Sequence, residues 1–420
     1  MYNISMEYKS NHNITYSCKY HVVFCPKYHR KVLVDGVDTR LKELITERKW
    51  LCMTTMRGYK YRIYPDEKQA NLINRTLGCC RFVYNHFLAV RRDEWNANHR
   101  GLYYKQTNLL LTELKRRDET CWLREVDSMA LQESLRNLDD AYARFFKKQT
   151  RYPRFKFKHN HTQSYRTRNQ SNGIRFENGN LKLPKVGLVR IRLSRAFEGK
   201  IKHVTVSRTA SGKYFVSLCV EENASFAPCG KGQIGIDVGL KEFYSDSNGN
   251  TVGNPHLLRR FQKKLRREQR RLSRKMPQSH NRDKQRVRVA RVHEHIKNIR
   301  RDFQQKLTTQ LINENQVIAV EHLKIKNMLK NKKLAKSISD ASWYEFIREL
   351  EYKAAWRGAR ILKVDTFYPS SQTCGTCGYK NPLVKNLAVR EWDCPQCGAH
   401  HDRDVNAAQN ILKKALEQVA

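Results

Sequence analysis

The pattern of hydrophobic and polar residues changes character several times along the chain. Alternation predicts a strand over 57–64, and apolar residues then recur at helical spacing from 68 to 150. Short alternating stretches separated by turn pairs follow between 174 and 222, and we interpret them as strands of a small β-barrel. Because the first strand precedes the helices, we expect the helical stretch to be an insertion into this barrel.

The second half of the chain alternates apolar strands with helices. Two strands end in carboxylates, Asp237 and Glu321, and a strand meander with an Asn-Gly turn follows the first of them. A long, basic helical hairpin is predicted over 257–313, and an apolar helix begins near Asp404. The resulting order, β-β-β-α-β-α-β-α, fits the ribonuclease-H-like fold. The sequence therefore predicts a multidomain α+β protein whose second half is an α/β domain.

Composition narrows the class of function. The chain has 420 residues, a formal net charge of +41 and 10% aromatic residues. This length is sufficient for two or three domains with real cores, and a folded protein this basic is most simply a nucleic-acid binder. Binding to a membrane surface is the alternative, but the positive charge is spread over almost the entire length. The sequence shows neither a signal peptide nor an apolar run of transmembrane length.

Two CxxCG motifs near the C-terminus indicate a structural zinc site with four thiolate ligands. The glycine after each pair, Gly378 or Gly398, suits a turn that points backbone N–H groups at the thiolates. The alternative is two unrelated pairs of free cysteines. Twelve cysteines in a chain of this size also fit a reducing compartment with metal ligation. The predicted zinc ligands are Cys374, Cys377, Cys394 and Cys397.

Three acidic residues form the candidate catalytic site. Asp237 and Glu321 lie at the ends of apolar strands, and Asp404 opens the last helix. A buried carboxylate without a partner is costly, so these residues need a partner or a metal. Three carboxylates can hold two Mg²⁺ ions ~3.5–4 Å apart, one activating water and the other stabilising the leaving oxygen of a phosphodiester. Asp237 would then bridge both ions, with Glu321 and Asp404 each completing one.

Each of these acids also has a structural alternative. Asp404 could be the N-cap of its helix rather than a metal ligand. Asp402 is the second candidate for the third ligand, because the sequence does not decide which acid of the Asp-Arg-Asp motif faces inward. The occurrence of three acids at these places in one predicted fold nevertheless favours a metal-binding active site.

Basic residues in two regions are candidate nucleic-acid contacts. Aromatic residues between 155 and 176 are interleaved with Lys and Arg, as on surfaces that combine stacking with phosphate contacts, although about half of these aromatics are expected in the barrel core. The hairpin over 257–313 is dense in arginine, and its few acids make a coiled-coil role less favourable. For any single basic residue, solvation is a sufficient explanation. The candidates are Arg154, Lys156, Lys158, Arg166, Arg259, Arg260, Arg266, Arg267, Arg270 and Arg271.

Residues 1–52 resemble the opening of the small single-tyrosine (HUH) transposases, with a basic, alternating strand followed by a short helix. The metal-binding His-hydrophobe-His pair and the catalytic tyrosine of that family would come later, but the chain departs from the family at about Trp50. The His-x-His sequences at 159–161 and 293–295 do not match, because their middle residues are not hydrophobic. The resemblance therefore implies a truncated remnant without activity.

From about residue 56 to 416 the chain resembles the TnpB family, transposon-encoded RNA-guided endonucleases related to the type V CRISPR effectors. Two of the matching motifs, YPSSQTCGTCG and DRDVNAAQNIL, are together highly specific. The motifs are FVYN at 82–85, LRNLDDAYARFF at 135–146, PRFK at 153–156, GIDVGL at 235–240, VEHL containing Glu321, YPSSQTCGTCG at 368–378 and DRDVNAAQNIL at 402–412.

The TnpB resemblance implies a RuvC-like nuclease domain with an inserted zinc ribbon, a wedge β-barrel and an inserted helical recognition domain. It also implies a guide RNA transcribed from the transposon end, a double-stranded DNA target and a location in the prokaryotic cytoplasm, associated with the nucleoid. The acids carried over from the family, Asp237, Glu321 and Asp404, are all present. The implied domains are 53–67 and 151–228 (wedge barrel), 68–150 (helical domain), 229–372 and 399–420 (RuvC-like domain) and 373–398 (zinc ribbon).

Two other functions compete with an RNA-guided nuclease. One is a non-cleaving RNA-guided DNA-binding protein that serves as a repressor or as a transposition accessory factor. The other is a protein-only transposase, which shares the fold and metals but binds transposon ends without RNA. The intact acids favour the nuclease. The sequence leaves open the guide, the motif beside the DNA target, the residues that read it, the oligomeric state and whether the N-terminal graft folds.

Overall fold

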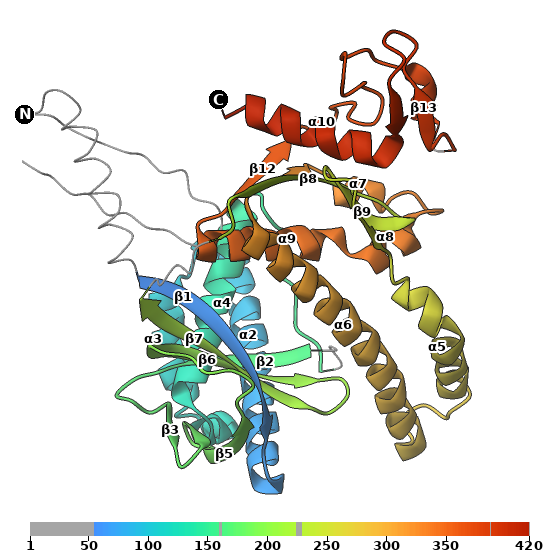
Figure 1. Cartoon of the computed structure of the whole chain (residues 1–420). Coiled ribbons are helices and arrows are strands. Elements are labelled where there is room, and N and C mark those ends of the chain that lie inside the picture. Colours follow the sequence, from blue (N-terminus) through green and yellow to red (C-terminus); the bar gives the residue numbers. More distant parts are fainter. Residues whose placement is uncertain (1–53, 159–161, 224–228, 387, 420) are drawn as a thin grey trace, which may run out of the picture. The chain divides into compact units, whose positions relative to one another are not determined.

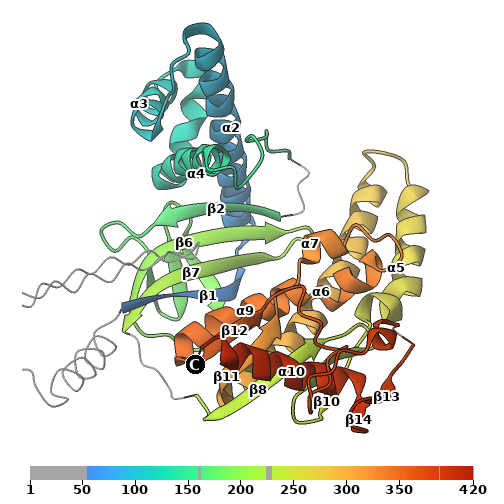
Figure 2. The same ribbon diagram turned by 90° about the horizontal axis from the view of Figure 1, so that it is seen from above.

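The computed structural model describes residues 54–158, 162–223, 229–386 and 388–419. From Thr55 on, these residues belong to one compact unit. The predicted remnant over 1–52 lies outside the described residues. The unit is a mixed α/β structure built on a seven-stranded, a five-stranded and a two-stranded sheet (Figures 1 and 2). Among the described helices, none is long and apolar enough to span a membrane.

The seven-stranded sheet is antiparallel and contains the strand that precedes the helices. Its strands are β1 (Thr54–Tyr64), β2 (Thr162–Arg168), β3 (Arg175–Glu177), β4 (Asn180–Leu183), β5 (Gly187–Arg192), β6 (Lys200–Thr209) and β7 (Tyr214–Asn223). The strand order is β2-β6-β7-β1-β5-β4-β3, so β1 pairs within the sheet although a helical segment separates it from β2 along the chain. Where the sequence predicted a small β-barrel, the structure has a half-barrel, since the described residues of β2 and β3 do not pair and β3 has only three residues.

The helical segment between β1 and β2 is the predicted insertion. It consists of α2 (Glu67–Asn98), α3 (Tyr104–Leu114), a 3₁₀ helix (Asp118–Glu125) and α4 (Ser128–Phe146). A capping box starts α2: the Asp66 carboxylate accepts from the Gln69 N–H at 2.8 Å, and the Gln69 side chain accepts from the Asp66 N–H at 3.1 Å. Apolar residues of α2 and α4 share one core with the inner face of the half-barrel, so these helices and this sheet fold as one unit.

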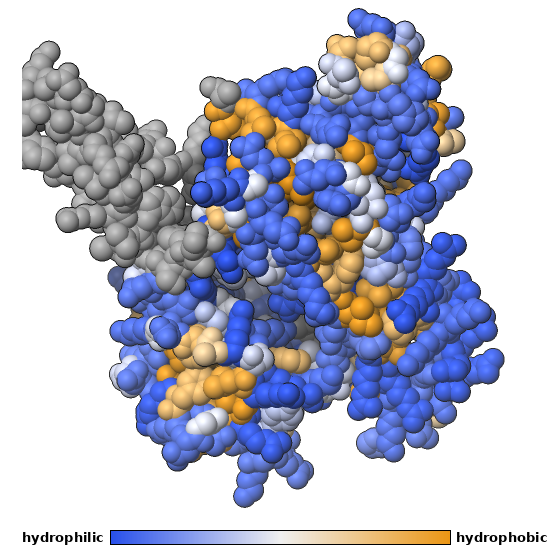
Figure 3. Space-filling view, in the orientation of Figure 1, coloured by the Kyte–Doolittle hydropathy of each residue, from blue (hydrophilic) through white to orange (hydrophobic). Residues whose placement is uncertain are grey.

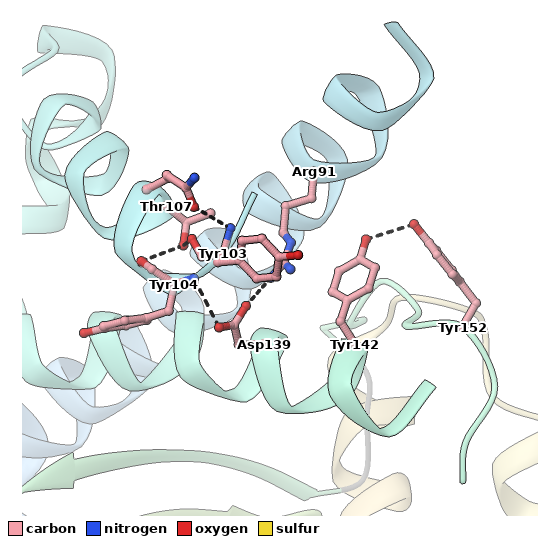
Figure 4. A network of polar contacts seen from close by, with 8 residues as sticks. Arg91, Tyr103, Tyr104, Thr107, Asp139, Tyr142 and Tyr152 are labelled. Atoms are coloured by element: carbon pink, nitrogen blue, oxygen red, sulfur yellow. Dashed lines mark hydrogen bonds and ion pairs between the residues drawn. The ribbon is translucent and has the colours of Figure 1, made fainter. Parts of the chain in front are cut away.

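One polar network holds the three helices together (Figure 4). The Asp139 carboxylate on α4 accepts from the Arg91 guanidinium on α2 at 2.5 Å and from the Tyr104 N–H at the start of α3 at 3.1 Å. The Arg91 guanidinium also lies 4.2 Å from the centre of the Tyr142 ring, whose hydroxyl is 2.9 Å from that of Tyr152. Each member has a partner, as buried polar groups require.

The five-stranded sheet has the order β10-β9-β8-β11-β12. Its strands are β8 (Gly232–Val238), β9 (Glu242–Asp246), β10 (Thr251–Gly253), β11 (Asn315–Glu321) and β12 (Arg360–Val364). The first three form the predicted antiparallel meander, and β11 is parallel to both β8 and β12. The helices are α5 (Leu257–Ser273), α6 (His280–Glu314), α7 (Ile325–Met328), α8 (Ala335–Ala341), α9 (Trp343–Arg357) and α10 (Arg403–Glu417). This element order confirms the predicted one.

The two faces of this sheet are covered by different helices. Ile236 and Val320 pack with residues of α6 and α9, including Phe346. Ala319 and its neighbours on the other face pack with Ile411 and other residues of α10. Figure 1 shows α10 on one side of the sheet and α9 on the other. Successive strand residues therefore point to opposite layers, as the two-residue period of a strand requires.

Helices α5 and α6 form the predicted hairpin. Its two arms share a small apolar cluster that includes Leu265 and Ile296. The chain reverses between Ser273 and His280, where the sequence predicted a polar break. Figure 3 shows the free end of the hairpin, at the lower right, as a largely hydrophilic surface.

The segment between β12 and α10 contains both CxxCG motifs. It includes a 3₁₀ helix (Pro382–Lys385) and the two-stranded sheet of β13 (Glu391–Asp393) and β14 (His400–Asp402). Its small core is formed by Val384, Trp392 and the buried cysteines Cys374 and Cys394. The second strand of this sheet leads directly into α10, so the segment and the helix are joined without a linker.

Candidate functional site

Asp237 and Glu321 lie side by side at one edge of the five-stranded sheet. Asp237 is the penultimate residue of β8 and Glu321 is the last residue of β11. The parallel register pairs Ile236 with Val320, so the next residues, the two acids, are neighbours and share a face. That face is the one covered by α10, because Gly235 and Ala319, two residues before the acids, both meet this helix.

The position of α10 brings Asp404 to the same edge. A side chain at Gly235 would overlap the carbonyl oxygen of Ala408, so the helix crosses β8 in direct backbone contact. Asp404 is the second residue of α10, one turn before this crossing. The three acids therefore come from two adjacent strand ends and a helix start that are far apart in sequence.

The three acids also interact electrostatically. Burial raises the pKa of Asp237 well above its usual range, and the charges of Glu321 and Asp404 raise it further, while Arg403 opposes them. Burial also raises the pKa of Glu321, partly offset by a hydrogen bond from Ser370. Within the described residues, the Asp237 carboxylate has no hydrogen-bond or ion-pair partner. Carboxylates in such surroundings favour a bound cation, and Mg²⁺ prefers oxygen ligands of this kind.

Asp402 and Asp404 have different contacts. Asp402 is the N-cap of α10, and its Oδ1 accepts from the N–H groups of Asp404 at 3.0 Å and Val405 at 2.9 Å. The Asp404 carboxylate is free of this capping role, and its Oδ2 lies 3.2 Å from Nη1 of Arg390. The N-cap alternative weighed for Asp404 therefore applies to Asp402 instead, and Asp404 is the acid whose charge reaches Asp237.

The four cysteines of the CxxCG motifs are grouped as a metal site requires. Their sulfurs all lie within 4.8 Å of one another. In the described ranges, no other group of three or more His, Cys, Asp or Glu residues brings its ligand atoms this close together. The Sγ–Sγ distances are 3.7 Å for Cys374 and Cys397 and 3.6 Å for Cys377 and Cys394. A tetrahedral zinc ion with ~2.3 Å bonds to sulfur would separate its ligands by a similar distance. Gly378 has the positive φ, 80°, that the knuckle turn requires.

His401 is a contact of this cysteine group that the sequence did not indicate. Its Nε2 lies 3.0 Å from Sγ of Cys374, and its ring packs on that of Trp392 with centroids 4.9 Å apart. Burial alone would raise the pKa of Cys374, but the backbone N–H of Cys377 and the His401 ring outweigh it and lower that pKa to about 5. Backbone N–H groups also oppose a rise in the pKa of Cys377 and Cys397, but burial and contacts with the other cysteines outweigh them and raise it. Without zinc, the thiolate, which is the form that binds zinc, is therefore favoured at Cys374.

The carboxylates are more widely spaced than the cysteines, and other polar residues contact them. Ser370 donates to Glu321 at 2.6 Å, and Arg390 pairs with Asp404. Arg403 is buried, donates to the Asn386 carbonyl at 3.4 Å and lowers the pKa of Asp237. Sequence reasoning missed these residues. The only available signal was that Ser370 and Arg403 lie inside the motifs YPSSQTCGTCG and DRDVNAAQNIL.

All ten candidate nucleic-acid contacts are solvent exposed, but they form two separate groups. Lys156 and Arg166 line a cavity of about 190 Å³ between α2, α4 and β2, next to Phe157, which is 69% exposed. The Lys156 ammonium lies 3.7 Å from the centre of the Tyr84 ring, and the partial burial of this end of the side chain lowers the Lys156 pKa. Arg154 and Lys158 lie on the same extended segment.

The second group consists of the arginines of α5. Arg267 and Arg271 pair with Glu268 at 3.5 and 3.3 Å. The other four arginines of this group form no ion pair with the residues that the structure describes, so their charge faces solvent. Of the aromatic residues interleaved with these charges near 155–176, Phe155 and Phe157 are exposed and Tyr165 is buried.

Four family models match the chain. A model described as a probable transposase matches residues 217–332, and a model described as a Cas12f1-like TNB domain matches 343–411. A helix-turn-helix domain model matches 53–100. A model described as an IS200-like transposase matches 14–62, which confirms the resemblance of the N-terminal region to a transposase and extends it beyond the expected departure at about Trp50.

Relatives match most of the chain. A protein of Streptomyces pristinaespiralis, named as a candidate RNA-guided DNA endonuclease, is 44% identical over 364 residues, covering 86% of this chain and 89% of its own. The InsQ protein of Escherichia coli K12, named in the same way, is 35% identical over 379 residues, covering 86% and 92%. A solved Cas12f1–sgRNA–target DNA complex aligns with a TM-score of 0.46 and 13% identity, over 85% of this chain and 98% of that one. Because the two relatives match most of both sequences at such identity, the chain belongs to the TnpB family.

Proposed function

We propose that this protein is an RNA-guided, Mg²⁺-dependent DNA endonuclease of a mobile element, which hydrolyses phosphodiester bonds. The observation that carries the proposal is the placement of Asp237, Glu321 and Asp404. They come from β8, β11 and α10 and meet on one face at one edge of the sheet. The names of the two relatives, each that of a candidate RNA-guided DNA endonuclease, support the same function.

The proposed roles of the acids follow from their positions. The carboxylates of Asp237, Glu321 and Asp404 would hold Mg²⁺, and Asp237, which has no partner among the described residues and feels the charges of both other acids, would be the ligand common to two ions. Bound Mg²⁺ would supply the activation of water and the stabilisation of the leaving oxygen. Ser370 orients the Glu321 carboxylate. Arg390 neutralises Asp404 until a cation competes for the carboxylate or a phosphate competes for the guanidinium.

The proposed domains follow the two sheets. The five-stranded sheet with α5 to α10 is the RuvC-like domain (229–372 and 399–420), and the cysteine segment is an inserted zinc ribbon (373–398). The strand β14, which pairs with β13 of this ribbon, lies just after that range and leads into α10. The half-barrel is the wedge domain (53–67 and 151–228), and the inserted helices (68–150) are the recognition domain. Zinc is structural here, because all four ligands of its tetrahedron would be cysteines and no position is left open for substrate.

The proposed partners are a guide RNA from the transposon end and a double-stranded DNA target. The net charge of +41 and the unpaired arginines of α5 support contacts with phosphates of either. An RNA-guided enzyme holds its heteroduplex by shape and charge, since base pairing reads the sequence. This division explains how so basic a surface can serve a sequence-specific reaction.

The test is cleavage by protein that is expressed together with its flanking transposon DNA. Wild type and Asp237→Ala would be compared on a plasmid that carries a guide-matched target beside randomised flanks, in Mg²⁺ or EDTA. We expect guide-dependent cutting in Mg²⁺ that is lost in the variant and in EDTA. RNA-dependent DNA binding without cutting by wild type would refute the nuclease and favour a non-cleaving repressor. Cutting or joining of transposon ends without any co-purifying RNA would favour a protein-only transposase.

A further inference from the structure

The loop between β12 and the first cysteine knuckle contacts the acidic site directly. Ser370 in this loop is 5% exposed, and its hydroxyl donates to Oε1 of Glu321 at 2.6 Å. Such a short bond to a carboxylate limits the rotation of the Glu321 side chain. The direction of the Glu321 carboxylate therefore depends on where the loop holds Ser370.

Two buried asparagines of α10 hold this loop. The Asn410 side chain, 3% exposed, donates to the carbonyl of Ser370 at 2.9 Å and to that of Thr373 at 2.6 Å. The Asn406 side chain, 2% exposed, donates to the Thr373 carbonyl at 2.8 Å and accepts from the Gly375 N–H at 2.9 Å. These side-chain amides have almost no access to water. If they lost their bonds to the loop, they would be buried without hydrogen-bond partners, which is costly.

The same bonds fix the backbone of a predicted zinc ligand. Thr373 and Gly375 are the residues on either side of Cys374. The approach at Gly375 is close, because an added Cβ would lie 3.0 Å from Oδ1 of Asn406. One continuous set of contacts thus runs from the first cysteine knuckle through Asn406, Asn410 and Ser370 to Glu321, and it is anchored on the helix that begins beside Asp404.

We propose that Ser370 is a positioning residue for Glu321, and that Asn406 and Asn410 join it to the zinc knuckle so that zinc in the four-cysteine group maintains the geometry of the acidic site. This inference rests on the proposed function, because it takes the acids to be the site of a divalent cation. Zinc then does more than stabilise its own segment. Loss of zinc increases the mobility of the backbone around Cys374, and through Thr373 and Ser370 it also increases the mobility of the Glu321 carboxylate.

The test measures cation binding separately from cleavage. Mn²⁺, used in place of Mg²⁺, is titrated into the RNA-bound protein and followed by electron paramagnetic resonance, while zinc content and thermal unfolding are measured on the same samples. The variants are Ser370→Ala and Asn410→Ala, with Ser371→Ala as the matched control. Ser371 is the neighbouring serine in the loop, and the described structure shows no hydrogen bond from its hydroxyl.

We expect Ser370→Ala to weaken Mn²⁺ binding about tenfold, the size of one hydrogen bond to a charged group. Asn410→Ala should weaken it in the same direction, and both variants should keep wild-type zinc content because all four cysteines remain. Ser371→Ala should stay within twofold of wild type. Guided DNA binding without added Mg²⁺ or Mn²⁺ should be unchanged in all three variants, since a local defect at the acids does not reach the DNA-binding surface.

A zinc-depleted variant, Cys397→Ala, tests the coupling itself and should also weaken Mn²⁺ binding. Unchanged Mn²⁺ affinity in Ser370→Ala or in the zinc-depleted variant would overturn the inference. So would a loss of zinc or of folding in Asn410→Ala that accounts for its weaker Mn²⁺ binding. If wild type binds Mn²⁺ at the acids but does not cut DNA, the proposed function fails while the positioning role of Ser370 is still tested by these titrations.

Discussion

The contact between β8 and α10 allows a sharp prediction for Gly235→Ala. The added methyl group would overlap the carbonyl oxygen of Ala408 and would lie 2.9 Å from Cβ and 3.0 Å from the backbone nitrogen of Leu412. Carbon atoms pack favourably at about 3.5–4.0 Å, so α10 must move away from the sheet by on the order of 1 Å. The obstacle includes backbone atoms, which cannot rotate aside as a flexible side chain would.

The expected cost is at the upper end of the range for overpacking, about 3 kcal/mol of unfolding free energy. For a domain of this size that corresponds to a fall in Tm of about 6–12 °C. The displacement also moves Asp404 relative to Asp237 and Glu321, and a misplacement of about 1 Å at reacting groups lowers rates by about 10²-fold. Thermal unfolding and guided plasmid cleavage, measured on the same preparation, check the two effects together.

The matched control is Gly78→Ala in the interior of α2. Apart from the neighbouring backbone of α2 itself, no atom of the described residues lies within 4 Å of the methyl position at Gly78, so the change only replaces a flexible helix residue by a better helix former. It should raise stability by about 0.5–1 kcal/mol and leave cleavage unchanged. A Gly235→Ala protein whose Tm and cleavage rate match those of wild type would refute the close contact and, with it, the placement of Asp404 by α10.

Three further predictions follow from individual contacts. Asp402→Asn should keep cleavage because asparagine is also a good N-cap, whereas Asp404→Asn should abolish it; equal loss in both would contradict the assignment of roles. Burial raises the pKa of Glu349, whose two carboxylate oxygens lack hydrogen-bond partners among the described residues. The folded protein is therefore most stable, as far as this group is concerned, below the unfolded pKa near 4.5, and it loses stability as pH rises through the raised folded pKa. Glu349→Met should raise Tm at pH 8, with a gain that shrinks toward pH 4. Replacing Arg266 and Arg270 of α5 by alanine should reduce the slope of log affinity against log salt for RNA or DNA by about one for each phosphate that the protein no longer neutralises, and an unchanged slope would remove these residues from the interface.

Local patterns were sufficient for much of the fold. The period-two and helical spacings identified the insertion between β1 and β2, the α5–α6 hairpin and the order along the chain of the elements that build the five-stranded sheet. They did not reveal that the predicted β-barrel is an open half-barrel, because closure depends on which edge strands find partners rather than on the residues of any one strand. The resemblance of the N-terminal region to a transposase is confirmed by sequence comparison, and the fold of residues 1–52 lies outside the described residues.

The sequence by itself identified the candidate ligands, because short motifs contain the residue types and spacings that bind metals. The repeated CxxCG spacing identified four cysteines, and apolar strands ending in acids identified Asp237 and Glu321. Only the tertiary structure decided how these residues meet. The parallel register of β8 and β11 places two acids on the same face, the contact at Gly235 brings Asp404 to them, and Asp402 caps the helix instead. The positions of Ser370, Asn410 and His401 depend on contacts between segments that lie far apart or in different elements, and periodicity within one segment carries no information about such contacts.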